Sequence, residues 1–505
     1  MTKDAPLVSL HPNVKAFIGE KRRMLIDGKW VDAKSGKSFE VLDPATGQVI
    51  AHVPAAEKPD VDVAVAAAKR AFESGPWSRM TPAERGKIVW KIGELIMEHQ
   101  EELAQIESLD NGKPVTVARA ADVVLAAELF QYMAGWCTKL DGRSLTLSVP
   151  YTPGSEYHAF TRREPVGVVA QIIPWNFPLL MAAWKLGPVL ASGCTVVLKL
   201  AEETPLSGLK LAELIQKAGV PDGVVNVITG FGETCGAPLA AHPDVSKVAF
   251  TGSTEVGKLI VKAAANDLKK VTLELGGKSP NIILDDADLE QAIPGAASAI
   301  FFNHGQCCCA GSRLFIQDKI YDKVVEGVAE YARKLKVGPG LDPSTQMGPL
   351  VSQVQLDRVC GYLESGKEQG ATFAAGGKRL GEQGYFVEPT VIVDAHENMK
   401  VYQEEIFGPV VAAVRFKELD DDLVRKANDT IYGLAAGIYT SNITRAHRLA
   451  TKLRAGTVWI NCYNIFDAAL PFGGYKQSGW GREMGVEVFN NYLETKSVCV
   501  GLGQG

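Results

Sequence analysis

The chain has 505 residues, which at about 100–200 residues per domain predicts two to four domains rather than one. Hydrophobic residues make up 46% and charged residues 22% of the sequence, close to the averages of globular proteins, so disordered and fibrous classes are excluded. The net charge of −5, with no long run of either sign, argues against nucleic acid or an anionic membrane surface as a partner.

Cysteine usage and the N-terminal composition predict the compartment. Nine cysteines, an odd number without paired spacing, do not describe a disulfide framework and favour a reducing compartment. Residues 1–23 show neither a secretory signal nor a transit peptide, so we expect a cytoplasmic protein. The uncharged stretch 165–184 resembles a membrane span in composition, but Pro174 and Pro178 within it favour a buried strand, turn and helix.

Residues 60–139 show the periodicity of amphipathic helices. Val61, Val65 and Ala68 recur at helical intervals. Residues 81–84 (Thr-Pro-Ala-Glu) place a capping residue, a proline and an acid in the order of a helix start. The region is therefore predicted to form a helical layer.

From residue 166 onward, apolar runs of strand length alternate with helical patterns. The predicted strands are Val166–Ile173, Thr195–Leu200, Val224–Ile228, Lys247–Phe250 and Val271–Leu275. Continuous apolar strands that alternate with helices predict a parallel sheet covered on both faces, which is a doubly wound α/β domain.

A second alternating series, from Asn281 to about Cys462, predicts a second doubly wound α/β domain. Its strands are expected near Ile282–Leu284, Leu314–Gln317, Val410–Phe416, Ala435–Thr440 and Thr457–Asn461. Two further segments, 141–164 and the alternating Thr495–Val500, suit a subunit-bridging hairpin and a tail that pairs with another chain. Edge strands of one monomer would have the same pattern, so both interpretations stay open.

Two glycine-rich turns follow predicted strands, where the ligand crevice of an open parallel sheet lies. Gly230-Phe231-Gly232 is followed by Gly236, so the GxGxxG fingerprint is imperfect and a simple tight turn is an alternative. Residues 252–258 fit GxxxxGK, but Leu259 replaces the hydroxyl that holds magnesium, which disfavours a P-loop nucleotide hydrolase. The free N–H groups of this helix start, with Ser253, suit a pyrophosphate, although a plain N-cap is equally compatible.

Lys199 and Glu202 follow another predicted strand. A carboxylate at that position can accept both ribose hydroxyls of an adenosine and would repel a 2′-phosphate, which favours NAD over NADP. Solvated surface charge is the alternative interpretation.

The triplet Cys307-Cys308-Cys309 is the most unusual feature of the sequence. Adjacent side chains diverge, no CxxC occurs and His304 supplies a single imidazole, so no metal site is expected. Gly305-Gln306 predicts a loop with free backbone amides, which favours a nucleophilic thiol, with buried inert cysteines as the alternative.

Two polar residues lie in unusually restricted sequence contexts. Glu274 is flanked by leucines at a strand end, so it is either paired or a base with a raised pKa. Asn176 lies between two prolines directly after the first predicted strand. That rigidity suits an oxyanion donor, and a turn residue that satisfies its own backbone is the alternative.

Together these residues resemble the NAD(P)-dependent aldehyde dehydrogenase superfamily over about residues 20–500. The matching motifs, in family order, are Pro174-Trp175-Asn176-Phe177-Pro178, Phe250-Thr251-Gly252-Ser253, Leu273-Glu274-Leu275-Gly276-Gly277-Lys278, Phe302-Asn303-His304-Gly305-Gln306-Cys307-Cys308, Glu404-Glu405-Ile406-Phe407-Gly408-Pro409 and Pro471-Phe472-Gly473-Gly474. One departure is Leu200, where many members have proline, and it leaves the neighbouring Lys199 and Glu202 in place.

The resemblance implies a role for each matching residue. Cys308 would be the nucleophile, Glu274 the general base and Asn176 the oxyanion amide. The cofactor NAD would be held by Ile173, Trp175, Lys199, Glu202, Gly232, Gly252, Ser253, Gly257, Glu405 and Phe407. The implied reaction is the irreversible oxidation of an aldehyde to its acid through a thiohemiacetal and a thioester on Cys308.

The resemblance also implies an aldehyde-dehydrogenase-like α/β fold. Residues 1–140 and 165–276 would form the NAD-binding domain and 277–480 the catalytic domain. Residues 141–164 and 485–505 would bridge the subunits of a homotetramer or homodimer. A catalytically silent structural homologue is the alternative of another class, but the retained Cys308, Glu274 and Asn176 argue against it.

The implied substrate tunnel is apolar, with no Arg or Lys to receive a second anion. Its residues are Phe177, Leu180, Met181, Trp184, Phe302, Ile465, Phe466 and Phe472. A charged semialdehyde is therefore disfavoured, and phenylacetaldehyde or another hydrophobic aldehyde is expected. The segment 464–481 is most similar to bacterial phenylacetaldehyde dehydrogenases, which would place the enzyme in aromatic degradation. Medium-chain aliphatic and betaine-type aldehydes are alternatives, because an aromatic box also binds a quaternary ammonium.

Overall fold

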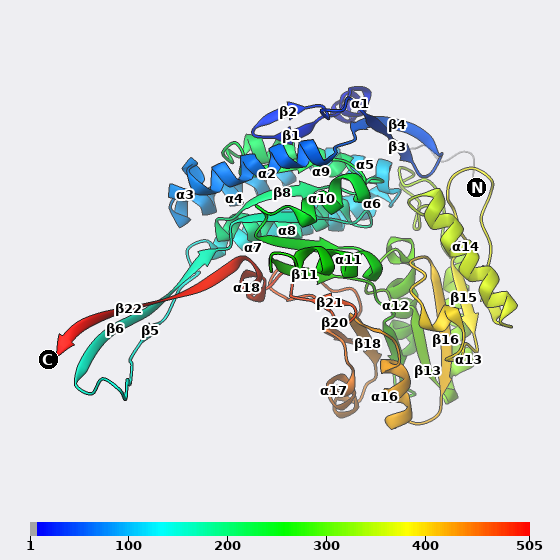
Figure 1. Ribbon diagram of the computed structural model, residues 1–505. Coiled ribbons are helices and arrows are strands. Elements are labelled where there is room, and N and C mark those ends of the chain that lie inside the picture. Colours follow the sequence, from blue (N-terminus) through cyan, green and yellow to red (C-terminus); the bar gives the residue numbers. More distant parts are fainter. Residues whose placement is uncertain (1–7, 505) are drawn as a thin grey trace.

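The structure, a computed structural model, describes residues 8–504 and consists of two α/β units, each built on its own sheet, and a projecting β arm (Figure 1). Residues 1–7 and Gly505, which the sequence prediction assigned to the first domain and the bridging tail, lie outside the described residues. Within the described residues, no helix is both long and apolar enough to cross a membrane.

The first unit is built on an eight-stranded sheet in the order β2-β1-β9-β8-β7-β10-β11-β21. Its central strands β9, β8, β7, β10 and β11 are parallel, as the apolar runs predict, but β1 and β21 join the two sides antiparallel. The sheet is therefore mixed at its edges. The strands are β1 (Met24–Ile26), β2 (Lys29–Val31), β7 (Val168–Ile172), β8 (Thr195–Lys199), β9 (Val225–Ile228), β10 (Lys247–Thr251), β11 (Lys270–Glu274) and β21 (Gly479–Trp480).

A layer of helices covers this sheet, as the periodicity of residues 60–139 predicts. Thr81 and Glu84 form a reciprocal capping box at the start of α4. The uncharged stretch after β7 becomes α8, which begins at Pro178 and is buried along its whole length. The helices are α1 (Pro12–Gly19), α2 (Lys58–Glu73), α3 (Pro76–Arg79), α4 (Pro82–Glu98), α5 (Gln100–Asn111), α6 (Val115–Val117), α7 (Val123–Trp136), α8 (Pro178–Ser192), α9 (Leu206–Lys217), α10 (Ala237–Ala241) and α11 (Thr254–Ala264), with π-helical turns η1 (Ala118–Asp122) and η2 (Gly232–Gly236).

The second unit has a seven-stranded sheet in the order β14-β15-β16-β13-β12-β18-β19, parallel except at β14. Its strands are β12 (Pro280–Ile283), β13 (Arg313–Gln317), β14 (Thr372–Ala375), β15 (Thr390–Val393), β16 (Val410–Phe416), β18 (Ala435–Tyr439) and β19 (Thr457–Ile460). Its helices are α12 (Leu289–Phe301), η3 (Phe302–Gly305), η4 (Asp318–Ile320), α13 (Tyr321–Lys334), α14 (Gln353–Glu368), α15 (Lys400–Gln403), α16 (Asp421–Asn428) and α17 (Ile443–Lys452). One buried core continues from α4, α7 and α8 of the first unit into α12 and α13 of the second. The two units are thus joined through packed side chains.

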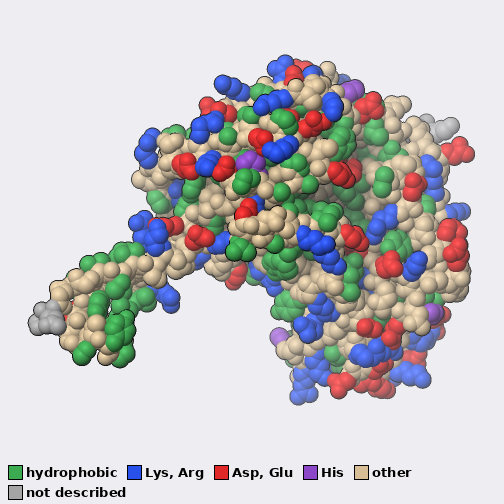
Figure 2. Space-filling view, in the orientation of Figure 1, with side chains coloured by type: hydrophobic (Ala, Val, Ile, Leu, Met, Phe, Trp, Pro, Cys, Tyr) green, Lys and Arg blue, Asp and Glu red, His purple; other side chains and the backbone are tan. Residues whose placement is uncertain are grey.

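The arm is a three-stranded sheet in the order β22-β6-β5 that projects away from the body (Figure 1). It consists of β5 (Ser144–Leu145), β6 (Ser155–Pro165) and β22 (Leu493–Gln504), and β22 follows η5 (Val486–Val488) and α18 (Phe489–Tyr492). The C-terminal strand pairs antiparallel with β6 of the same chain, from Leu493 opposite Pro165 to Gln504 opposite Ser155. It is longer than the predicted Thr495–Val500 segment. Hydrophobic side chains gather on the arm in Figure 2.

Several short strands were not predicted. The prediction missed β1 and β2, the hairpin of β3 (Ser38–Asp43) and β4 (Gln48–Pro54), the strands β14 and β15, and the small pair of β17 (Tyr432–Gly433) and β20 (Tyr475–Lys476). Most of these strands are edge strands or isolated pairs. Burial on one side only, or over two to four residues, leaves little continuous apolar pattern to recognise.

Candidate active site

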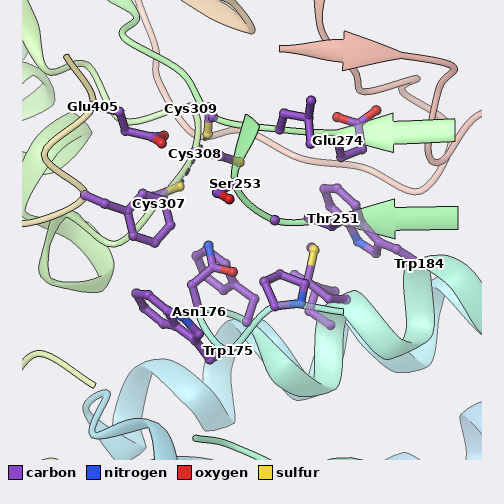
Figure 3. Close-up of a pocket in the computed structure, with 18 of the residues that line it drawn as sticks. Trp175, Asn176, Trp184, Thr251, Ser253, Glu274, Cys307, Cys308, Cys309 and Glu405 are labelled. Atoms are coloured by element: carbon purple, nitrogen blue, oxygen red, sulfur yellow. Dashed lines mark hydrogen bonds between the residues drawn. The ribbon is translucent and has the colours of Figure 1, made fainter. Parts of the chain in front are cut away.

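A cavity of about 370 Å³ lies where the two units meet. Its walls come from the ends of β10 and β11, the start of α8, and the turn after η3. Figure 3 shows the cysteine triplet and Glu405 on one side of the cavity, Glu274 toward one end, and Asn176 on the side of α8. The volume falls within the range typical of small-molecule sites. The three predicted catalytic residues all line this one cavity.

Cys308 lies in the turn after η3 and is half-buried, whereas Cys307 and Cys309 are buried. The sulfurs of the two buried cysteines approach each other to 3.4 Å. The backbone N–H of Cys308 has no acceptor within residues 8–504, so it is free to donate into the cavity. Cys308 is thus the most accessible thiol of the triplet.

The three thiols affect one another's ionisation. Hydrogen bonds from the Cys308 and Cys309 side chains lower the pKa of Cys307 well below the usual range, although burial raises it. Hydrogen bonds with the Cys307 side chain raise the pKa values of Cys308 and Cys309 well above the usual range, and burial and the charge of Cys307 raise them further.

Asn176 lies in the turn between β7 and α8 and is 4% exposed. Its Nδ2 donates to the carbonyl oxygen of Gln306 at 3.1 Å. An amide nitrogen carries two hydrogens, so a second N–H remains for a ligand in the cavity. The side chain therefore presents a rigid donor on the wall that faces the cysteine turn.

Glu274 is the last residue of β11 and is 6% exposed, with no partner for its Oε2 within the described chain. Burial raises its pKa well above the usual range, and the neighbouring Glu483 carboxylate raises it further, whereas Lys185 and Arg482 lower it. Lys185 Nζ and Glu483 Oε1 form a buried ion pair at 2.6 Å. Both were missed by the sequence prediction, although a lysine inside an otherwise apolar helix is a recognisable signal.

The predicted cofactor residues divide into two sets. Trp175, Gly252, Ser253, Glu405 and Phe407 line the cavity. Ile173, Lys199, Glu202, Gly232 and Gly257 lie outside it, around the carboxyl ends of β7 and β8 and along α11. The structure thus extends the predicted cofactor surface from the cavity across the edge of the first sheet, where ligands of such sheets bind.

The outer set is centred on an ion pair. Lys199 Nζ lies 3.1 Å from Glu202 Oε2, and a Cβ added to Gly232 would lie 3.8 Å from Glu202 Oε1. Gly257 has a packing role, because a Cβ there would lie 2.7 Å from Leu275 Cδ2 and hold α11 away from β11. The Ile173 N–H donates to the Lys199 carbonyl at 3.3 Å.

The inner set surrounds the start of α11. Ser253 Oγ caps that helix by accepting from the Val256 N–H at 3.3 Å, while the hydroxyl of Thr251 is buried without a partner in the described chain. Glu405 accepts from the Gly277 N–H at 2.8 Å, and burial raises its pKa to about 7. The rings of Trp175 and Phe407 meet edge to face at 5.2 Å. The start of α11, the unpartnered hydroxyl of Thr251 and the Glu405 carboxylate, which can accept hydrogen bonds from a ribose, fit a dinucleotide cofactor.

The side of the cavity that holds Glu274 and Trp184 has an aromatic wall (Figure 3). Of the predicted tunnel residues, Phe177, Leu180, Met181, Trp184, Phe302, Phe466 and Phe472 line it. Trp184, Phe466 and Phe472 contact one another, with ring centroids 5.5–6.0 Å apart. The prediction was wrong for Ile465, which is 56% exposed and does not line the cavity. Its carbonyl accepts from the Trp459 indole, and the next residue, Phe466, packs inward instead.

Comparison with known proteins identifies relatives over nearly the whole chain. A model of the aldehyde dehydrogenase family matches residues 30–498. The NAD⁺ complex of an aldehyde dehydrogenase from Bacillus cereus is 53% identical, with a TM-score of 0.96, and the match covers 98% of this chain and 100% of that one. A betaine aldehyde dehydrogenase from Staphylococcus aureus in complex with NAD⁺ is 41% identical, with a TM-score of 0.93 and 97% of each chain covered. The mitochondrial benzaldehyde dehydrogenase of Antirrhinum majus is 49% identical over 95% of this chain and 89% of that protein.

Fold and site together define an oxidoreductase with a dinucleotide surface beside a thiol-bearing cavity. The chain belongs to the aldehyde dehydrogenase family. It is an NAD-dependent enzyme that oxidises aldehydes.

Proposed function

We propose that the chain oxidises a hydrophobic, aromatic aldehyde such as phenylacetaldehyde to its carboxylic acid. The observation that carries this proposal is the wall of mutually packed Trp184, Phe466 and Phe472 rings in the same cavity as Cys308. Ring packing of a substrate adds about 0.5–1.5 kcal/mol beyond the burial of its area. A role in aromatic degradation, in the cytoplasm, is part of the same proposal, and the nine free thiols agree with a reducing compartment.

The catalytic roles follow from what each side chain can do. The Cys308 sulfur, once deprotonated, attacks the aldehyde carbon, and the resulting oxyanion accepts from Asn176 Nδ2 and the Cys308 N–H, donors worth about 2.7–4 kcal/mol each. NAD, when bound, accepts the hydride that leaves this carbon. Glu274 then takes a proton from water, which attacks the thioester and releases the acid and the free thiol.

The NAD surface is assigned by the chemistry of its residues. Ile173, Trp175, Lys199, Glu202, Gly232, Gly252, Ser253, Gly257, Glu405 and Phe407 would hold the cofactor. Glu202, paired with Lys199, would accept the ribose hydroxyls, and the start of α11 would receive the pyrophosphate. We also assign residues 1–140 and 165–276 to cofactor binding, 277–480 to catalysis, and 141–164 with 485–505 to subunit contacts.

Betaine aldehyde is a second candidate, because a relative with that name is 41% identical and the cavity is rich in aromatic rings. A quaternary ammonium needs ring faces around it. Centroid distances of 5.5–6.0 Å leave Trp184, Phe466 and Phe472 in contact with one another, which favours a continuous wall over an open cage.

The experiment is a comparison of kcat/KM for phenylacetaldehyde, hexanal, betaine aldehyde and succinic semialdehyde on one preparation. We expect phenylacetaldehyde to be used best and the charged semialdehyde worst, because a second carboxylate would be buried without a cationic partner. Phenylacetaldehyde more than about tenfold below the best of the others, a gap of about 1.4 kcal/mol in transition-state binding, would overturn the assignment.

A further inference from the structure

The side-chain amide of Asn303 joins the two chain segments that carry the oxyanion donors. Asn303 is 6% exposed and does not line the cavity. Its Nδ2 donates to two backbone carbonyls, that of Asn176 at 2.9 Å and that of Gln306 at 3.0 Å. The first carbonyl belongs to the turn before α8, and the second lies two residues before Cys308.

The Gln306 carbonyl also accepts from Asn176 Nδ2 at 3.1 Å. The amides of Asn176 and Asn303 therefore converge on one oxygen. If the Asn176 amide were rotated by half a turn, its Oδ1 would face the Gln306 carbonyl oxygen, and two acceptors repel each other. The Gln306 oxygen therefore keeps the Nδ2 of Asn176 directed toward the cysteine turn. Asn303 fixes that oxygen and, at the same time, the backbone of Asn176.

We propose that Asn303 is a positioning residue that sets the separation of the two oxyanion donors, Asn176 Nδ2 and the Cys308 N–H. This inference rests on the proposed roles of Cys308 and Asn176. Asn303 does not line the cavity, so it would not contact a substrate bound there. It acts by holding the turn before α8 and the cysteine turn at a fixed distance from each other.

The backbone explains why asparagine suits this position. Asn303 and His304 both have left-handed backbones, with φ values of 48° and 60°. Asparagine, aspartate and glycine tolerate that conformation, and among them asparagine alone supplies a nitrogen with two N–H donors. From the other side, Gln306 Oε1 accepts from the Val351 N–H at 3.0 Å, so the turn is held at both of its faces.

The test compares Asn303→Asp with a matched control. Asn226 is also buried, and its Nδ2 likewise donates to two backbone carbonyls, those of Val196 and Gly223, but toward the amino end of β9 and outside the cavity. Asn226→Asp removes the same kind of donor pair at a place that does not support the oxyanion. Melting temperatures of both variants measure the general loss of stability.

The main measurement is the cofactor-free reaction with p-nitrophenyl acetate. The Cys308 sulfur bonds to the acetyl carbon, the ester C–O bond breaks, and p-nitrophenolate leaves, so the rate of its initial burst reports attack through an oxyanion. We expect Asn303→Asp to slow this burst by more than about tenfold, and Asn176→Ala by about a hundredfold, while Asn226→Asp stays within about threefold of the wild type. Alkylation of Cys308 by iodoacetamide forms no oxyanion and should keep its wild-type rate in Asn303→Asp.

A pH series adds a readout that a loss of stability would not produce. The aspartate of Asn303→Asp opposes two carbonyls when charged but donates to one of them when protonated. The ratio of variant to wild-type burst rate should therefore rise as the pH is lowered. Asn303→Gly, which keeps the left-handed backbone and removes the amide, should be slow at every pH, and it replaces Asn303→Asp if that variant does not fold.

Three outcomes would overturn the inference. The first is a wild-type burst rate in Asn303→Asp and Asn303→Gly while Asn176→Ala is slow. In that case the proposed function stands, but Asn303 does not position the oxyanion donors. The second is an equal slowing of the burst and of alkylation, which would mean that Asn303 positions the thiol instead. The third is an unchanged burst in Asn176→Ala as well, which would contradict the proposed oxyanion site itself.

Discussion

At the scale of single residues, the cysteine triplet gives a sharp prediction. Cys308→Ser should lower aldehyde oxidation by at least about a thousandfold, because the half-buried Cys308 is the most accessible thiol of the triplet and is the proposed nucleophile. Cys307→Ser and Cys309→Ser should keep most of the activity, since both side chains are buried and face each other at 3.4 Å. Steady-state reduction of NAD measures all three variants, and an inactive Cys307→Ser beside an active Cys308→Ser would contradict the assignment.

Glu274 leads to a prediction about the order of steps. Glu274→Gln should still form the thioester and then stall, because the proton that the carboxylate removes belongs to the later hydrolysis. The expected trace is a burst of about one reduced cofactor per active site, followed by slow turnover. Loss of the burst itself would instead mean that Glu274 activates Cys308.

The same residue predicts a pH dependence in the wild-type enzyme. The raised pKa keeps Glu274 protonated at low pH, so hydrolysis of the thioester should accelerate as the pH rises through that pKa. Glu483→Gln removes a charge that raises this pKa and leaves Lys185, which lowers it, so the acceleration should move to lower pH. Single-turnover rates across a pH series measure the shift, and a shift to higher pH would contradict the electrostatic account.

The sequence identified the candidate catalytic residues more readily than the residues that surround them and affect their chemistry. Cys308, Glu274 and Asn176 stand out because a cysteine triplet, an acid between leucines and an amide between prolines are unusual by themselves. Lys185 and Glu483, which affect the pKa of Glu274, come from elements far apart in the chain and form an ion pair with each other. No local pattern encodes such a contact, since it depends on how α8 meets the segment that follows β21.

At the scale of elements, the end of β8 predicts cofactor choice. Glu202 lies three residues after Lys199, the last residue of β8, and is paired with it at 3.1 Å. Glu202→Gln should raise the efficiency with NADP relative to NAD by about tenfold, because a carboxylate near a 2′-phosphate costs on the order of 1.4 kcal/mol.

Glu203 offers the matched control. Burial raises its pKa to about 7, with a further contribution from the Glu202 charge, so it carries less negative charge near neutral pH. Glu203→Gln should therefore change the NADP-to-NAD ratio less than Glu202→Gln. Equal kcat/KM values with NAD and NADP in the wild-type enzyme would contradict the proposed role of Glu202 in cofactor choice.

The central elements were predictable for a physical reason. A parallel strand covered on both faces is apolar at every position, and β7, β8 and β9 are buried throughout, so their sequences are recognisable without any partner. The edge strands β2 and β14 are mostly exposed or half-buried, so their sequences show no continuous apolar run. The prediction therefore captured most of the parallel centre of each sheet and missed the short parallel strand β15 and the antiparallel margins.

At the scale of the whole molecule, the active cavity depends on how the two units are joined. Asn176 belongs to the first unit and Gln306 to the second, and a side-chain hydrogen bond of 3.1 Å connects them across 130 residues of sequence. The aromatic wall likewise combines Trp184 of α8 with Phe466 and Phe472 of the loop after β19. Many of the residues predicted from the sequence line one cavity, but the distances between them arise only from the packed junction of the units.

The arm leads to the last prediction, which concerns assembly. Its outer strand β22 pairs with β6 on one side and has no strand on the other within the described chain. It also exposes Val500 and Leu502, by 46% and 61%. A long, exposed, apolar edge strand promotes uncontrolled association unless another surface covers it. We therefore expect a homodimer or homotetramer in which the arm contacts a second subunit.

The double variant Val500→Lys with Leu502→Lys should dissociate the oligomer, because burying two new charges at a subunit contact is unfavourable. The fold of each subunit should stay intact, since both side chains are exposed on the arm. The matched control is Ile443→Lys with Leu268→Lys, which places the same charges on exposed apolar positions of the body and should leave the mass unchanged. Light scattering at micromolar concentration measures the mass, and circular dichroism verifies the fold. A wild-type chain that is monomeric under these conditions, or an oligomer that survives the arm variant, would contradict a subunit contact through β22.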